Sequence, residues 1–339
     1  MGNVKHHIPE KMLAVRQHKA GGRLVLEEVA VPRPGPGDVL VKMAASPINP
    51  SDLGLLKERG LNGAYPFTPG LEGSGTVIES GGGLLGGFRK GKRVACSPQP
   101  AGDGTWAEYM KTSVMRTVPL PRSVSMDQGA MMLVNPMTAM AFMHLAREGK
   151  HRAMVNNAAA SSLGKMLIGL CAEKGIPLIN IVRKNEHVTQ LRNLGASHVL
   201  NSSDAFFDTE LKQLALQLEA SLFLDAIGGE HCAKLLSAAP PASTLIIYAR
   251  LSGEFLQIDP GDLIRDDKKI IGFQLGNWLN TKGILFKLKF ISQIKKQLVS
   301  QLSSHVNREY PMKEVEDALS YYKEHMSLGK ILIKPTANS

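Results

Sequence analysis

The sequence describes a globular protein of two domains rather than a fibrous, disordered or membrane-spanning chain. Its 339 residues exceed what one compact core usually holds, and 43% hydrophobic with 21% charged residues is a globular balance. The formal net charge of +10 calls for an anionic partner: nucleic acid, a membrane surface or an anionic small molecule. Because Lys and Arg are spread along the chain without a basic block, nucleic acid is an unlikely partner on charge patterning.

Cysteine usage and the terminal segment indicate a cytoplasmic protein. Cys96, Cys171 and Cys232 lie far apart without a CxxC pair, so neither a disulfide framework nor a structural zinc lobe is expected. Residues 1–9 contain two histidines and no apolar stretch, so we expect no signal peptide. The longest apolar region, 130–146, is too short and too polar to span a bilayer, and no membrane partner is expected.

The first part of the chain is expected to form an irregular, mostly antiparallel β domain. A stiff loop is predicted at 32–38, where three prolines alternate with other residues and two glycines permit sharp reversal. A short helical pattern is present at 53–57. Strands are predicted at 13–15, 24–26, 39–41, 69–78, 91–95 and 104–109.

The second part alternates strands with helices, which is the pattern of parallel βαβ units and predicts a doubly wound α/β sheet. The predicted strands are 153–157, 178–182, 198–200, 222–226, 244–248 and 269–273. Helices are predicted between them, including 163–174, 186–194 and 209–218. An amphipathic helix at 282–302 follows, and a last strand at 330–333 is expected to rejoin the first domain.

A turn of small residues between strand 153–157 and the next helix is the candidate phosphate-binding site. Such a turn lets backbone N–H groups and the positive end of the helix dipole face an anion, usually a dinucleotide pyrophosphate. Gly164 is the only glycine left where the dinucleotide fingerprint has three, so an ordinary strand-to-helix turn remains the alternative. The residues expected to approach the cofactor are Ala159, Ala160, Ser161, Ser162, Leu163 and Gly164.

Arg183 and Lys184 indicate the type of dinucleotide. In an NAD site the second strand usually ends in Asp or Glu about 20 residues beyond the fingerprint, where it binds the ribose 2′-hydroxyl. Arg183 lies 183 − 164 = 19 residues beyond Gly164, and Lys184 follows it. Since a guanidinium can pair with a 2′-phosphate that a carboxylate would repel, NADPH is expected over NADH. The alternative is a solvated arginine at a helix start.

Several runs together resemble the medium-chain dehydrogenase/reductase superfamily over nearly the whole chain. The runs are Ile48 to Asp52, Pro69 to Gly73, Gly91 to Val94, Leu194 to Ala196, and Asp225 to Gly229. Two more, Val134 to Ala139 and Ile179 to Arg183, are similar to the 2-enoyl thioester reductase and quinone oxidoreductase branch. The resemblance implies a GroES-like catalytic domain at 1–127 and 278–339 and a Rossmann NADPH-binding domain at 128–277.

The same resemblance places this chain in the zinc-free branch. Zinc-dependent relatives have a cysteine in the loop occupied here by 46–49, a histidine before the glutamate of a Gly-His-Glu run, and four closely spaced cysteines. Here Leu71 precedes Glu72, and leucine has no lone pair to offer a metal. No metal site is therefore expected, and Glu72 is predicted to be a structural, hydrogen-bonded or ion-paired residue rather than a catalytic base.

The expected reaction is hydride transfer from NADPH to a carbon activated by its own carbonyl, as in an enoyl thioester, an enone or a quinone. The protein must then supply hydrogen-bond donors to the carbonyl oxygen and a proton to Cα. By resemblance, Asn49 and Asn135 are the candidate donors, although each could instead cap a loop. Thr138 is expected to open the following helix, and either binds the nicotinamide amide or only caps that helix. Tyr248 and Arg250 complete the expected cofactor-binding set.

Two further segments carry the candidate substrate-binding and proton-donor residues. Trp278 resembles the substrate-pocket segment of enoyl reductases, with Gln274 where those relatives usually carry another Trp, and core packing is the alternative. The relatives' catalytic tyrosine corresponds to Gly60 here, so Tyr65 is the candidate proton donor unless it only packs. An NADPH-binding protein with little catalysis, structural or RNA-binding, is the competing interpretation.

A homodimer is expected, because strands 244–248 and 269–273 resemble those that pair across a twofold axis in similar proteins, and twofold dimers are the commonest assemblies.

Overall fold

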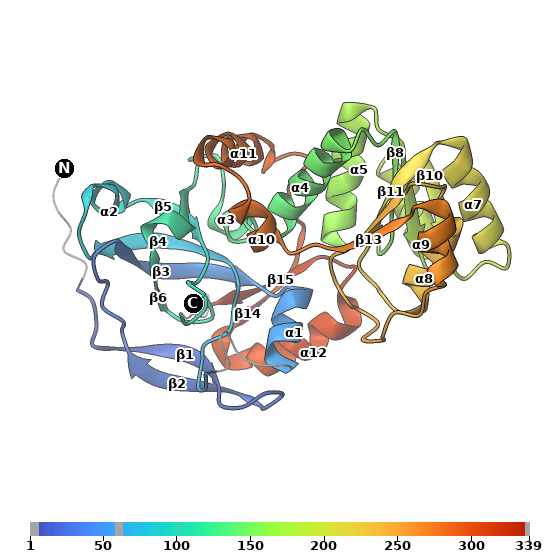
Figure 1. Ribbon diagram of the computed structural model, residues 1–339. Coiled ribbons are helices and arrows are strands. Elements are labelled where there is room, and N and C mark those ends of the chain that lie inside the picture. The colour runs from blue at the N-terminus through green and yellow to red at the C-terminus, as the bar shows by residue number, and fades with distance from the viewer. Residues whose placement is uncertain (1–6, 58–63, 101, 336–339) are drawn as a thin grey trace. The chain divides into compact units, whose positions relative to one another are not determined.

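The computed structural model describes residues 7–57, 64–100 and 102–335. The chain divides into two compact units (Figure 1). Unit 1 comprises Met1–Val134 with Gln293–Ser339, and unit 2 comprises Asn135–Ser292. Among the described residues, no helix combines the length and apolar character needed to cross a bilayer.

Unit 1 is rich in β-strands. Its strands are β1 (Lys11–Gln17), β2 (Leu24–Ala30), β3 (Asp38–Pro47), β4 (Gly73–Ser80), β5 (Arg93–Cys96), β6 (Tyr109–Ser113), β7 (Thr117–Pro119), β14 (Val306–Pro311) and β15 (Lys330–Lys334). Its helices are α1 (Pro50–Lys57), α2 (Leu84–Arg89), η2 (Val114–Arg116), α3 (Met126–Ala130), η3 (Met312–Glu314) and α12 (Val315–His325). The sequence boundary between Ser292 and Gln293 falls within helix α11 (Ile284–Gln297).

The main sheet of unit 1 gathers strands from both ends of the chain. Its order is β14-β15-β3-β4-β5-β7, with β6 also paired to β3, while β1 and β2 form a separate antiparallel pair. Strand β15 pairs antiparallel with β3 through Leu332 and Pro47, so the last strand rejoins the first domain as the sequence predicted. Helix α12 buries residues at the i, i+3, i+4, i+7 spacing of an amphipathic helix, namely Val315, Ala318, Leu319 and Tyr322.

Unit 2 is a doubly wound α/β domain, which confirms the fold class expected from the alternation. Its strands are β8 (Ala153–Asn156), β9 (Leu178–Val182), β10 (His198–Asn201), β11 (Ala220–Asp225), β12 (Thr244–Ile247) and β13 (Lys269–Gly272). Its helices are α4 (Asn135–Glu148), α5 (Ser162–Lys174), α6 (Asn185–Asn193), α7 (Phe207–Gln217), α8 (Glu230–Ala238), α9 (Pro260–Asp266) and α10 (Leu275–Asn280). Every residue of β8 and β9 is buried, as expected for strands covered on both faces.

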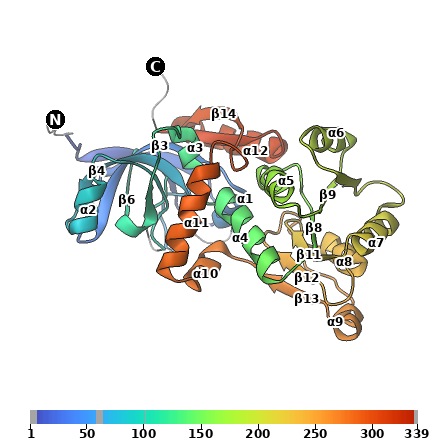
Figure 2. The same cartoon turned by 90° about the horizontal axis from the view of Figure 1, so that it is seen from above.

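The strand order of unit 2 places the ligand-binding edge. All pairs are parallel and the order is β10-β9-β8-β11-β12-β13, so the connections reverse direction between β8 and β11. Open sheets of this type bind ligands outside the carboxyl ends of the strands at this reversal. Helices α5 and α6 lie on one face of the sheet and α7 and α8 on the other (Figure 2). The turn into α5 begins at this edge.

The unit boundaries differ from the expected 128–277 range at both ends. Helix α3 belongs to unit 1 because it packs against β3 and β4 and because Gln128 Nε2 donates to the Ser304 carbonyl at 2.6 Å. Residues beyond 277 belong to unit 2 because Trp278 and Phe286 pack around His144 of α4. Side-chain packing of this kind extends past the point where the strand-helix alternation ends.

Candidate cofactor-binding and catalytic site

The small-residue turn lies between β8 and α5 at the carboxyl edge of the sheet. Ala158 adopts the left-handed conformation with φ of 49°, which turns the chain sharply without a glycine. Ala159 N then donates to the Ile181 carbonyl at 3.2 Å and joins the turn to β9. Ala159 and Ala160 are both buried. The turn is therefore held against the neighbouring strand before α5 starts.

Gly164 and Ser161 shape the start of α5. A Cβ on Gly164 would lie 2.3 Å from the Ala159 carbonyl oxygen, so only glycine fits where the turn and the helix meet. Ser161 is the N-cap, and its Oγ accepts from Gly164 N at 3.1 Å. The N–H groups of Ser162 and Leu163 precede the first intrahelical donors and point out of the helix end. This donor set, with the helix dipole behind it, suits a pyrophosphate.

Asn157 and Asp225 fasten the two central strands together beside this turn. Asn157 Nδ2 donates to Asp225 Oδ1 at 2.5 Å, and Asn157 Oδ1 accepts from Ala226 N at 2.7 Å. Asp225 Oδ1 also accepts from Ile227 N and Gly228 N at 2.8 and 3.0 Å. Neither residue of this pair was among the predicted site residues. Their position at the ends of two predicted strands was the available signal.

Arg183 and Lys184 follow β9 directly and are both exposed. The Arg183 carbonyl accepts from Ser203 Oγ at 3.1 Å, which holds the backbone at the strand end. Lys184 Nζ lies 3.3 Å from Glu186 Oε1. The structure thus places two cations at the carboxyl edge next to the turn, where the ribose of a bound dinucleotide lies in folds of this type.

Glu72 is the centre of a buried charged cluster in unit 1. Its Oε1 accepts from Asn49 Nδ2 at 3.0 Å, and its Oε2 accepts from Leu133 N and Val134 N at 2.8 and 3.0 Å. Lys330 Nζ donates to Asn49 Oδ1. Burial raises the pKa of Glu72, while the ammonium of Lys330 and these hydrogen bonds oppose that rise. The prediction that Glu72 is a structural, hydrogen-bonded residue is confirmed.

Asn49, a predicted substrate-facing donor, is fully buried in this cluster. Both ends of its amide are engaged, by Glu72 and by Lys330. Its backbone N also donates to Asp52 Oδ2 at 2.8 Å. These contacts give Asn49 a structural role within unit 1 and leave Asn135 as the remaining asparagine candidate.

The residues around Glu72 do not fit a catalytic zinc. Within residues 7–57, 64–100 and 102–335, no group of three or more His, Cys, Asp or Glu side chains is placed to hold a metal ion. Leu71 contributes its backbone N to Asp52 Oδ1 at 3.1 Å, and its side chain has no lone pair. The Glu72 carboxylate already accepts hydrogen bonds from three N–H donors.

The remaining cofactor candidates lie in unit 2. Helix α4 begins at Asn135, so the expectation that Thr138 opens this helix is wrong; Thr138 is buried in its first turn. Tyr248 N donates to the Asp225 carbonyl at 2.9 Å, and its ring packs on Phe142 with centroids 5.0 Å apart. Arg250 is exposed two residues further on.

Trp278 and Gln274 lie around α10. Gln274 Oε1 accepts from Asn277 N at 2.6 Å, so Gln274 caps α10 through its amide oxygen. The Trp278 ring packs on Phe286 and Phe290 with centroid distances of 5.8 and 5.5 Å, which supports the packing alternative. Its buried Nε1 has no hydrogen-bond partner among the described residues and remains a potential donor.

Tyr65, the candidate proton donor, is half-buried in unit 1. Its ring makes an edge contact with Phe67, with centroids 5.6 Å apart, and packs on the cluster that includes Trp106. Gly60, the position matched to the relatives' tyrosine, lies outside the described residues. The structure supports the packing role of Tyr65, and its catalytic role stays a prediction.

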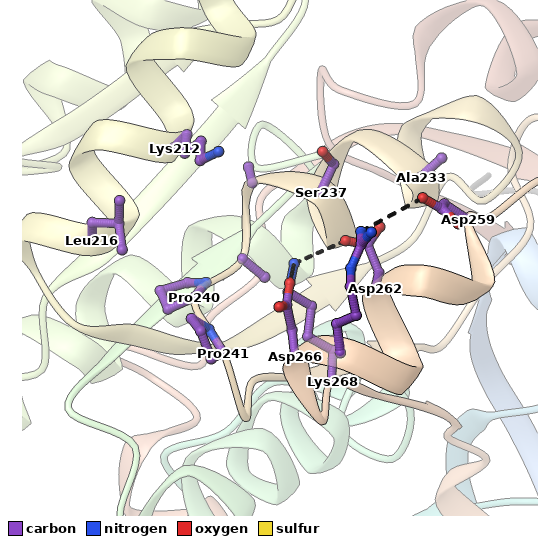
Figure 3. A pocket seen from close by; sticks show the side chains of 13 residues that line it. Lys212, Leu216, Ala233, Ser237, Pro240, Pro241, Asp259, Asp262, Asp266 and Lys268 are labelled. Atoms are coloured by element: carbon purple, nitrogen blue, oxygen red, sulfur yellow. Dashed lines mark hydrogen bonds and ion pairs between the residues drawn. The ribbon is translucent and has the colours of Figure 1, made fainter.

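A hollow of about 510 Å³ opens between α7, α8 and α9 of unit 2 (Figure 3). Its charged groups neutralise one another: Lys268 Nζ lies 3.1 Å from both Asp262 Oδ1 and Asp266 Oδ2. Residues at the C-terminal ends of α7 and α8 line this hollow. These helix ends lead into the amino ends of β11 and β12. It therefore lies toward the edge opposite the turn and is not the cofactor site.

Known families match both parts of the chain. Residues 35–122 match the family described as the alcohol dehydrogenase GroES-like domain, and residues 162–289 match the family described as zinc-binding dehydrogenase. The chain is 30% identical over 251 residues to the mitochondrial enoyl-[acyl-carrier-protein] reductase of Bos taurus, which covers 72% of this chain and 66% of the bovine protein.

Solved structures match over nearly the full length of the chain. A protein assigned as an NADPH:quinone reductase from Mesorhizobium loti is 31% identical, with a TM-score of 0.87, covering 97% of this chain and 100% of that one. A 2-haloacrylate reductase is 25% identical, with a TM-score of 0.81, covering 96% of this chain and 100% of that one.

Proposed function

Because the chain belongs to the medium-chain dehydrogenase/reductase superfamily of oxidoreductases, we propose that it is an NADPH-dependent, zinc-independent reductase. Its substrate is a conjugated C=C of an enoyl thioester or enone, or a quinone. The observation that carries the proposal is the α5 turn, tight at Gly164 and joined to β9, with Arg183 directly after that strand. The enoyl, quinone and haloacrylate reductases among its relatives support the same class of electron-poor acceptor.

Residues of this chain are proposed to act in three ways. The N–H groups of Ser162 and Leu163 bind the pyrophosphate, and Arg183 pairs with the 2′-phosphate. NADPH supplies the hydride when bound. Asn135 and the Trp278 indole N–H are the proposed donors to the substrate oxygen, where negative charge develops after hydride addition. Tyr65 is the proposed proton donor to Cα.

Cofactor preference is tested by the Arg183→Gln variant. We expect the unmodified protein to oxidise NADPH with at least about tenfold higher kcat/KM than NADH, and Arg183→Gln to lose that preference while keeping its NADH rate. Arg192→Gln, an exposed arginine on α6, is the control and should keep the preference. Equal efficiency with both cofactors in the unmodified protein would contradict the NADPH assignment.

Substrate class is tested by stopped-flow oxidation of NADPH with a crotonyl thioester, an enone and a quinone. We expect turnover with at least one. Tyr65→Phe should slow the thioester and enone reactions, which need a proton at Cα, and leave the quinone reaction unchanged because a quinone can take protons from water. Tight NADPH binding without turnover of any substrate would instead support a binding protein with little catalysis, structural or RNA-binding.

A further inference from the structure

Cationic side chains from three segments of unit 2 lie close together beside the α5 turn. The turn is joined to β9 through Ala159 N and the Ile181 carbonyl, and Asn156 of β8 pairs in register with Asn180 of β9. The chain then turns directly into α6, with His187 N donating to the Lys184 carbonyl at 3.0 Å. The end of β9, the first turn of α5 and the first turn of α6 therefore lie together at the carboxyl edge of the sheet.

Lys165 is the residue that α5 contributes to this group of cations. It is half-buried and lies three residues after Ser162, on the same helix face, while Leu163 and Met166 on the other face are buried. Helical side chains lean toward the N-terminus, so the Lys165 stem runs back toward the turn that binds the pyrophosphate. Burial lowers the pKa of Lys165, which reflects a cation held partly out of water.

His187 comes to the same place from α6, and its side chain is only 14% exposed. The charged groups that face it are Glu186 of its own helix, with Oε1 3.6 Å from Nε2, Lys184 and Arg183 at the end of β9, and Lys165 of α5. Burial lowers the pKa of His187, Glu186 raises it, and the three cations lower it. Because three cations and only one carboxylate face His187, the region around it carries a net positive charge. This charge favours the binding of an anion.

We propose that Lys165 and His187, with Arg183, form a binding site for a phosphomonoester dianion, the 2′-phosphate of NADPH, and that His187 takes up a proton when it binds. This rests on the proposed NADPH dependence and extends the site beyond the strand-end arginine. Sequence spacing singled out only Arg183 and Lys184, because Lys165 and His187 are brought in by the packing of two helices.

The pH dependence has a defined sign. A dianion next to His187 stabilises the imidazolium, so the pKa of His187 is higher in the NADPH complex than in the free protein. NADPH affinity therefore rises as the pH falls through the interval between these two pKa values. NADH lacks the phosphate and should show no such rise.

The test measures dissociation constants of NADPH and NADH by fluorescence titration at about pH 6.5 and about pH 8, above the second phosphate pKa of about 6. Lys165→Gln should weaken NADPH about tenfold and leave NADH within about twofold, and Lys165→Arg should restore most of the loss. His187→Gln should remove the gain in NADPH affinity at the lower pH. Lys174→Gln, in the last turn of α5, is the control and should change neither.

Binding of 2′,5′-ADP against 5′-AMP repeats the comparison without the nicotinamide. If Lys165→Gln weakens both cofactors equally or neither, or if His187→Gln keeps the pH dependence, the inference is wrong while the proposed function stands. If the unmodified protein binds no dinucleotide, the proposed function fails and this inference fails with it. Retained NADH binding shows that each variant is folded.

Discussion

At the scale of single residues, the candidate site depends on positions where adding one carbon atom or removing one charge would change the structure. Gly164 is such a position, because a Cβ there would lie 2.3 Å from the Ala159 carbonyl oxygen. Glu72 is another, since one carboxylate accepts hydrogen bonds from Asn49, Leu133 and Val134. The residue types at both positions were visible in the sequence, and the contacts that make them necessary were not.

Gly164→Ala is expected to displace the turn from α5. We expect about tenfold or greater loss of affinity for both NADPH and NADH, and a loss of about 1–3 kcal/mol in the free energy of unfolding, as in overpacked sites. Fluorescence titration and urea unfolding measure these quantities. Gly54→Ala is the control, because its Cβ would meet nothing within 4 Å. Unchanged cofactor binding in Gly164→Ala would refute the tight-turn model.

Asp52 gives the stability of unit 1 a pH dependence. Burial raises its pKa to about 7, although the N–H groups of Asn49 and Leu71 and the Lys330 ammonium oppose this. Since the folded-state pKa exceeds the ordinary value of 3.8, its stabilising contribution is complete below that value and is lost as the pH rises through about 7.

The free energy of unfolding should therefore fall between about pH 4 and about pH 7, and less steeply in Asp52→Asn, which keeps the shape but cannot ionise. Urea unfolding across this range measures the slope. Asp317→Asn, an exposed carboxyl of α12, should match the unmodified protein. The same slope in Asp52→Asn and in the unmodified protein would contradict the assignment.

At the scale of elements, the parallel sheet of unit 2 was the most predictable part of the molecule. The predicted strands 178–182 and 244–248 correspond to β9 and β12 within one residue at each end, because buried parallel strands appear as short apolar runs. Helices α9 and α10 were not predicted. Each is short and has no buried residue, so neither carries an apolar period.

Asn157→Asp tests the hydrogen bond that connects the ends of β8 and β11. It places a second carboxylate where Asn157 Nδ2 now lies 2.5 Å from Asp225 Oδ1. We expect a loss of about 3–5 kcal/mol in the free energy of unfolding at neutral pH, as for an uncompensated buried charge, with partial recovery in acid as one carboxyl protonates. Denaturant unfolding at both pH values measures it. A loss of stability that does not depend on pH would show that charge repulsion between the two carboxylates is not its cause.

At the scale of the whole molecule, β13 ends the parallel sheet of unit 2 and is largely exposed. Ile271 in this strand is 45% exposed, and an apolar edge strand is a template for pairing with another chain. This supports the expected homodimer, in which β13 would pair with its copy about a twofold axis.

Light scattering coupled to size exclusion should give the mass of a dimer for the unmodified protein. Ile271→Lys should shift the equilibrium toward monomer, because a charge on an edge strand opposes pairing. Val25→Lys is the matched control, since Val25 is 43% exposed on β2 of unit 1. A monomer at all concentrations, or equal dissociation of both variants, would argue against a β13 interface.

The sequence by itself determined the fold class, the strands of unit 2, the turn before α5 and the candidate arginine, because local apolar periods and small-residue runs report directly on backbone structure. Only the tertiary structure decided which side chains meet. It buried Asn49 between Glu72 and Lys330, and it brought Lys165 and His187 to the end of β9. Such contacts join residues that are distant along the chain, and their geometry depends on packing that no local pattern records.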